Sequence, residues 1–85
     1  MPRVGLIGFG FIGSRVFARL RDQPELGLEI AFVHNRTRPA AVPEVLILDD
    51  LGGIADRRVD LVVEMAHPDY TRLWGESILA CASYL

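Results

Sequence analysis

The feature that most constrains the fold is a glycine-rich turn near the N-terminus, where an apolar run leads into G-x-G-x-x-G spacing. The run Val4–Ile7 is almost continuously apolar, which is typical of a strand covered on both faces of a parallel sheet. After the glycines, apolar residues recur at helical spacing from about Phe11 to Arg21. The sequence therefore predicts a strand, a tight turn and a helix in that order.

The three glycines of this turn have separate expected tasks. Gly8 would make the tight turn, Gly10 would let a pyrophosphate approach the backbone, and Gly13 would let the helix pack closely against the strand. The unpaired amides and the positive dipole end of a helix N-terminus favour a bound phosphate. We therefore interpret the turn as a dinucleotide site. The alternative is that the glycines only shape a tight strand–helix connection.

The first helix has a predicted buried stripe and a predicted end. Ile12, Val16, Phe17 and Leu20 recur at helical spacing and are expected to face the core, while the arginines between them face water. Pro24 disfavours helix in the residue before it, so the helix is expected to stop at residues 22–24.

Beyond this helix, short apolar runs keep alternating with helical segments. This alternation predicts an α/β fold, a doubly wound parallel sheet of Rossmann type with right-handed crossovers. Because a complete sheet of this type has about six strands, we expect an incomplete one of about four strands in the order 3-2-1-4. The later strands are expected at 28–33, 45–48 and 60–65, a last helix at 69–82, and the start of a fifth strand at 83–85.

The region between the second and third strands departs from the usual pattern. Pro39 and Pro43 bracket only three residues, so the second crossover helix is expected to be short or missing. Asp49 or Asp50 could cap a short helix that reaches Ala55, which Gly52 and Gly53 would weaken. We prefer this capping role over a metal site for the two carboxylates, and we expect no metal site in the chain.

Composition excludes several function classes. A chain of 85 residues forms one domain at most, and its net charge of −2 provides no basic surface for nucleic acid. No apolar run reaches the roughly 18 residues of a membrane span. The single cysteine, Cys81, fits a reducing compartment, and no signal peptide is evident. We therefore expect a cytoplasmic protein that contacts neither nucleic acid nor membrane.

A second nucleotide signal follows the second strand. The residue about 20 positions beyond the glycines recognises the adenosine ribose; an acid there favours NAD, whereas an arginine accommodates the 2′-phosphate of NADP. This chain has Asn35, Arg36, Thr37 and Arg38 there, and no carboxylate. Asn35 can hydrogen-bond a hydroxyl, and Arg36 can pair with a phosphate. We expect NADP to be at least accepted, with NAD as the alternative; otherwise the arginines are solvated loop charges.

The loop after the fourth strand lies where such folds bind their ligands. Ala66 and His67 are expected to line the cofactor near the nicotinamide ribose. His67 as an acid or base is the weaker alternative, because no partner lies at motif spacing. His34 is expected to be structural or to lie beside the adenine.

Three segments together, residues 8–13, 32–36 and 60–68, resemble the L-aspartate dehydrogenase family, especially its animal members. The resemblance covers essentially the whole chain and implies NAD(P)-dependent oxidative deamination of L-aspartate, or the reverse amination. It implies that Gly8, Gly10, Phe11, Ile12 and Gly13 bind the pyrophosphate, and that Asn35 and Arg36 bind the adenosine ribose. Homoserine dehydrogenase and related folds share the glycine motif.

The same resemblance assigns catalysis to residues outside this chain. The family's catalytic histidine and substrate-binding residues lie in a following domain, so residues 1–85 correspond to the N-terminal part of an NAD(P)-binding domain and carry no catalytic residue. The isolated chain is expected to be inactive, and the complete protein is expected to bind L-aspartate and to form a homodimer. The alternatives are a truncated, non-catalytic NADP-binding or interaction module and a homoserine dehydrogenase-like enzyme.

Overall fold

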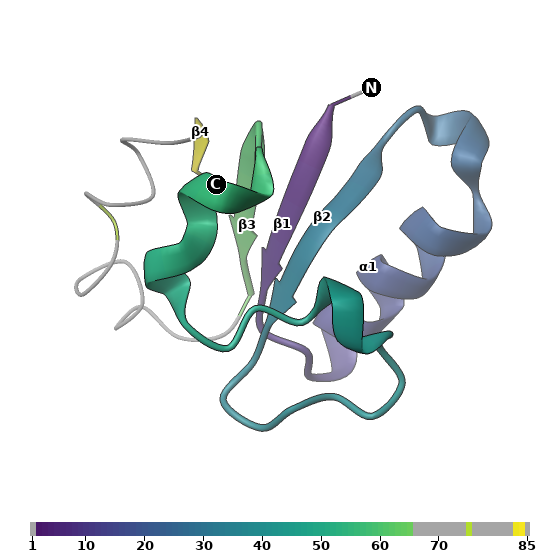
Figure 1. The fold of residues 1–85 in the computed structure, drawn as a ribbon. Coiled ribbons are helices and arrows are strands. Elements are labelled where there is room, and N and C mark those ends of the chain that lie inside the picture. Colours follow the sequence, from purple (N-terminus) through teal and green to yellow (C-terminus); the bar gives the residue numbers. More distant parts are fainter. Residues whose placement is uncertain (1, 66–74, 76–82, 85) are drawn as a thin grey trace.

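The computed structural model describes residues 2–65, 75 and 83–84, which form a parallel sheet flanked by helical segments (Figure 1). The strands of this sheet are β1 (Arg3–Ile7), β2 (Glu29–His34), β3 (Leu61–Glu64) and β4 (Ser83–Tyr84). Within the described ranges, the helical segments are α1 (Phe11–Asp22) and the 3₁₀ helices η1 (Pro24–Leu26), η2 (Glu44–Leu46) and η3 (Leu51–Arg57). The α/β class and the parallel sheet predicted from the sequence are confirmed.

The sheet has the order β2-β1-β3-β4, and each neighbouring pair is parallel. The predicted order 3-2-1-4 is not confirmed, because the third strand expected at 45–48 is absent as a strand. The amides of Leu46 and Ile47 donate locally, to the carbonyls of Pro43 and Glu44. These bonds form η2, and only a single bridge between Ile47 and Val33 remains beside β2.

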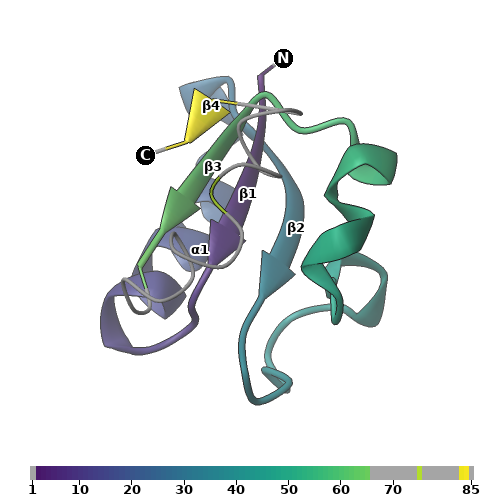
Figure 2. The ribbon, with the colours of Figure 1, turned by 90° about the vertical axis from the view of Figure 1, so that its left-hand side faces the viewer.

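Both faces of β1 are covered, as the apolar run predicts. Val4 and Leu6 pack with Phe17 of α1, whereas Ile7 packs with Leu51 and other residues of the η3 side. Figure 2 shows α1 and η3 on opposite sides of the sheet. The doubly covered sheet therefore has two separate small cores.

The pairing of β1 with β2 contains a bulge that the sequence does not reveal. Val4 pairs with Ile30, but Gly5 pairs with Phe32, so Ala31 is the extra residue. The Phe32 ring then lies across Gly5, where an added Cβ would approach ring atom Cε2 to 2.1 Å. Gly5 is therefore required for packing, although it precedes the glycine motif.

Helix α1 begins at Phe11 as predicted and ends one residue later than predicted, but its buried face differs from the predicted stripe. Phe17 is buried, whereas Val16 and Leu20 are half-buried and Ile12 is 65% exposed. The expectation that Ile12 faces the core is wrong. Ile12 lies in the first turn of α1 and is not among the apolar residues of the described chain that pack against either core cluster.

The helix predicted after residue 48, with an aspartate as its cap, is present as the 3₁₀ helix η3. The Asp50 carboxylate accepts a hydrogen bond from the Gly52 amide at 2.8 Å, and η3 follows. The helix is 3₁₀, consistent with the weakening expected from its two glycines. No α-helix lies between β2 and η3. The last helix predicted at 69–82 lies outside the described residues, apart from residue 75.

Candidate functional site

The carboxyl ends of three strands meet beside the glycine turn. Ile7 pairs with His34 of β2 on one side and with Glu64 of β3 on the other. The amide of Gly8 donates to the His34 carbonyl at 2.7 Å, and the amide of Met65 donates to the Ile7 carbonyl at 2.7 Å. The turn therefore leaves the sheet at the edge where parallel α/β folds bind ligands.

The glycines of the turn have the geometry that their spacing predicts. Gly8 has φ +105°, a conformation that favours glycine. A Cβ on Gly13 would lie 2.5 Å from the Gly8 carbonyl oxygen, whereas a Cβ on Gly10 would meet no atom of the described chain within 4 Å. Gly13 is therefore a packing requirement, and the space beside Gly10 is open to a ligand.

The N-terminus of α1 opens into this space. Gly10 is its N-cap residue, with no side chain to accept from the helix amides, and the first turn holds no acidic residue. The first i→i−4 hydrogen bond runs from the Ser14 amide to the Gly10 carbonyl at 2.9 Å, so the amides of residues 11–13 precede it. The side chains of Phe11 and Ile12 are 74% and 65% exposed. These features make the helix end suitable for an anion.

Asn35 joins the turn to the loop after β2. Its side-chain oxygen accepts from the Phe9 amide at 3.0 Å, and its side-chain nitrogen donates to the Thr37 carbonyl at 2.8 Å. The sequence singled out Asn35 as a ribose ligand; in the structure both of its polar atoms already contact the backbone. Nothing in the sequence pattern indicates this bridging role.

The two loop arginines have different surroundings. The Arg38 guanidinium binds both carboxylate oxygens of Asp49 at 3.2 Å and contacts Glu44 at 3.3 Å. The hydrogen bond to Asp49, and to a smaller extent the one to Glu44, raises the pKa of the Arg38 guanidinium above its ordinary value. Arg36 is exposed and has no ion pair within residues 2–65. Arg36 is therefore the cation of this loop that is available to a ligand.

The remaining candidates divide into structural residues and residues outside the description. His34 Nδ1 lies 2.7 Å from the Leu48 carbonyl oxygen, in agreement with a structural role. Ala66 and His67, which directly follow Met65 in the sequence, lie outside the described residues, and so does Cys81. In the described part of the chain no group of three or more His, Cys, Asp or Glu residues could hold a metal ion. The described helices also include none long and apolar enough to cross a bilayer.

Comparisons with known proteins agree with this geometry. Residues 8–82 match the family model described as homoserine dehydrogenase, NAD binding domain. Two similar relatives are the aspartate dehydrogenase domain-containing proteins of Xenopus tropicalis, 39% identical, and Danio rerio, 33% identical. The match covers 98% of this chain but only 31% and 32% of those relatives.

A solved structure also resembles this chain and is likewise that of an aspartate dehydrogenase. The crystal structure of aspartate dehydrogenase from Thermotoga maritima matches 93% of this chain and 30% of its own chain, with a TM-score of 0.64 and 30% identity. The resemblance to aspartate dehydrogenases inferred from the sequence is thereby confirmed, and the chain spans about a third of the length of these proteins.

Proposed function

Because the chain belongs to the homoserine dehydrogenase NAD-binding domain family, we propose that it binds and orients the nicotinamide dinucleotide of an oxidoreductase that acts on L-aspartate. The observation that carries this proposal is the open space beside Gly10 at the N-terminus of α1. The bound dinucleotide would supply the hydride-transfer chemistry, and the protein would supply binding and orientation.

The pyrophosphate would lie against the turn formed by Gly8, Gly10 and Gly13. The amides of Phe11 and Ile12 would donate to its oxygens, because no side chain caps this helix end. The helix dipole adds about 0.3–1 kcal/mol for a negative charge placed there. The missing side chain at Gly10 allows the contact, since any Cβ would occupy the approach.

The adenosine ribose would lie over the loop after β2. Arg36 is exposed and without an ion pair among residues 2–65, so its guanidinium is available to a 2′-phosphate. We therefore propose that NADP is preferred to NAD. Asn35 would contribute by holding the turn and the loop together, and Thr37 would lie beside the ribose. Ala66 and His67, which follow β3, are proposed to line the nicotinamide end.

The substrate and the reaction are proposed from the named relatives and belong to a complete protein. L-Aspartate would be deaminated, or formed in reverse, with the catalytic residues supplied from outside the matched third. On this proposal the 85-residue chain alone binds the dinucleotide without turnover. The protein would be cytoplasmic and homodimeric. A homoserine dehydrogenase-like substrate is the second candidate, because the matching family model carries that description.

Calorimetric titration of the 85-residue chain with NADPH and with NADH tests the proposal. We expect binding of both, tighter for NADPH, and loss of both in Gly10→Ala, whose added methyl group occupies the phosphate approach without a clash in the fold. Gly53→Ala is the matched control, because that glycine lies in η3, away from the turn. A folded chain that binds neither dinucleotide, or a Gly10→Ala variant that binds normally, contradicts the proposal.

A further inference from the structure

Hydrogen bonds join successive residues of the glycine turn to successive residues of the loop after β2. The Gly8 amide donates to the His34 carbonyl at 2.7 Å. The next amide, that of Phe9, donates to the side-chain oxygen of Asn35 at 3.0 Å, across 26 positions of the chain. The first bond is made by the backbone alone, whereas the second depends on which side chain follows β2. Asn35 is therefore a place where the sequence controls how the loop lies against the turn.

The other end of the Asn35 side chain shapes the loop itself. Its nitrogen Nδ2 donates to the Thr37 carbonyl at 2.8 Å, and residues 36–37 form a bend. The Phe9 amide can only donate and the Thr37 carbonyl can only accept, so the Asn35 amide cannot turn over without losing both bonds. The bend that carries Arg36 is thus held in one orientation relative to Phe9.

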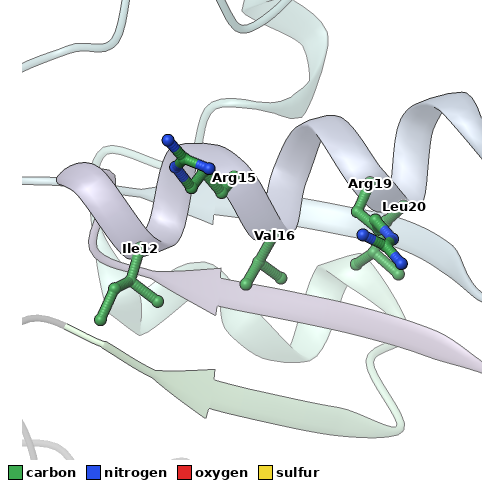
Figure 3. Close-up of a pocket in the computed structure, with 5 residues that line it drawn as sticks. All are labelled: Ile12, Arg15, Val16, Arg19 and Leu20. Atoms are coloured by element: carbon green, nitrogen blue, oxygen red, sulfur yellow. The ribbon is translucent and has the colours of Figure 1, made fainter.

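Phe9 is in turn fixed to helix α1. Its ring lies edge-on to the ring of Phe17, with centroids 5.6 Å apart and an interplanar angle of 67°. Phe17 is buried, and Val16, which points toward the strands in Figure 3, packs against the same core cluster. Through Phe9, the Asn35 side chain therefore places the loop relative to the helix whose N-terminus is the proposed phosphate site.

A dinucleotide would have to reach both regions at once. Its pyrophosphate and its 2′-phosphate belong to one molecule, so the affinity gained by joining them depends on how well the spacing of the two binding regions matches that molecule. We propose that Asn35 is the positioning residue that sets the spacing between the Arg36 guanidinium and the amides at the N-terminus of α1, and that it is not itself a ligand of the ribose. This role rests on the proposed dinucleotide site. Without the bridge, each region keeps its affinity for its own fragment of the coenzyme, but the joined molecule binds more weakly.

Comparing a ligand that spans both regions with one that occupies only the loop tests this role. The spanning ligand is NADPH, and the short ligand is adenosine 2′-monophosphate; both are titrated into the 85-residue chain, the former by calorimetry and the latter by NMR. In Asn35→Ala we expect NADPH to bind at least about tenfold more weakly, because the spacing is no longer set, and the affinity for adenosine 2′-monophosphate to change by less than about twofold.

Two further variants separate positioning from direct contact and from stability. Arg36→Met removes a proposed ligand and should weaken the binding of both molecules by the same factor. Asp50→Ala removes a side-chain bond to the Gly52 amide in η3, which is 2.8 Å long in the parent chain. It should lower the melting temperature, because the helix loses its cap, and leave both affinities unchanged.

Equal weakening of the two molecules in Asn35→Ala would make Asn35 a ligand and overturn its positioning role, and so would unchanged NADPH binding. If Asn35→Ala does not fold, Asn35→Gln, whose amide is one methylene further from the backbone, is judged by the same two affinities. A parent chain that binds neither NADPH nor NADH overturns the proposed function, and this role with it. A parent chain that binds NADPH, with either of the contrary Asn35 outcomes, overturns the positioning role alone.

Discussion

The glycine turn and the loop after β2 meet at one edge of the sheet, but different forces shape them. The turn depends on the backbone, through the positive φ of Gly8 and the clearance between Gly13 and the Gly8 carbonyl. The loop depends on side chains, through the two bonds of Asn35 and the pairing of Arg38 with Asp49. The turn offers bare amides to a ligand, and the loop offers the guanidinium of Arg36.

This difference has a consequence for how each region responds to substitution. At Gly13 of the turn, an added methyl group meets backbone atoms of Gly8 that cannot move aside, so the fold itself is affected, whereas at Gly10 it enters open space. In the loop, the ion pairs of Arg38 are between exposed side chains and are individually weak, so their loss should change stability little, whereas the bonds of Asn35 to the backbone contribute to stability. The following experiments would sharpen or remove this contrast.

Gly13→Ala should have the largest effect. Its Cβ would lie 2.5 Å from the Gly8 carbonyl oxygen and 3.0 Å from the Gly8 carbonyl carbon, so the free energy of unfolding should fall by about 3 kcal/mol. Urea denaturation measures this change. Gly10→Ala is the control, because its Cβ enters open space, and it should cost no more than about 1 kcal/mol. Equal losses in the two variants would contradict the packing role of Gly13.

Asn35→Leu should have the next largest effect. It removes the acceptor of the Phe9 amide and the donor to the Thr37 carbonyl, which should cost about 2 kcal/mol of stability. Hydrogen exchange of the Phe9 amide should become faster. Asn35→Asp keeps the acceptor and should leave that amide protected. An unchanged exchange rate in Asn35→Leu would show that the turn does not depend on this bond.

Arg36→Met should alter specificity rather than stability. Loss of a charge-assisted contact should weaken NADPH binding by about tenfold, equivalent to about 1.4 kcal/mol, and leave NADH binding unchanged. Calorimetry with both dinucleotides measures the ratio. Arg38→Met is the matched control, since Arg38 is already paired with Asp49 and Glu44. If Arg38→Met changes the ratio and Arg36→Met does not, the assignment of the two arginines is reversed.

Arg38→Met should have the smallest effect on stability. The side chain of Arg38 is 54% exposed, and its partners Glu44 and Asp49 are 82% and 65% exposed. Solvent and salt therefore screen both ion pairs. The melting temperature should fall slightly at low salt, and the difference from the parent chain should vanish at 1 M NaCl, where the Debye length is about 3 Å. A large, salt-independent loss would mean that the loop is part of the core.

Local sequence signals predicted the parts of the fold that depend on neighbouring residues. The glycine spacing predicted the turn and the start of α1, and Pro24 predicted its end. Asp49 and Asp50 were the two candidates for a helix cap, and Asp50 is the one that caps η3. Each signal acts through backbone conformation or a hydrogen bond within a few residues. The prediction of a strand at 45–48 was wrong. Local hydrogen bonds form η2 there instead of strand pairing with β2.

Contacts between residues far apart in the chain were beyond the sequence pattern. The bulge at Ala31 that places Phe32 over Gly5, the bridge from Asn35 to Phe9 and the pairing of Arg38 with Asp49 all depend on how β1, β2 and the loop are brought together. Periodicity also placed Ile12 in the core, although its side chain is largely exposed.

The amino-acid sequence by itself determined that a strand would end in a side-chain-free turn at the start of a helix, because glycine spacing and hydrophobic period act over a few residues. Only the tertiary structure decided which polar groups that turn leaves for a ligand. The Phe9 amide is bound by Asn35, 26 positions away, and the Arg38 guanidinium by Asp49, 11 positions away. Within residues 2–65, by contrast, Arg36 has no ion pair and the space beside Gly10 is open. That division depends on which strands lie side by side, which no local pattern encodes.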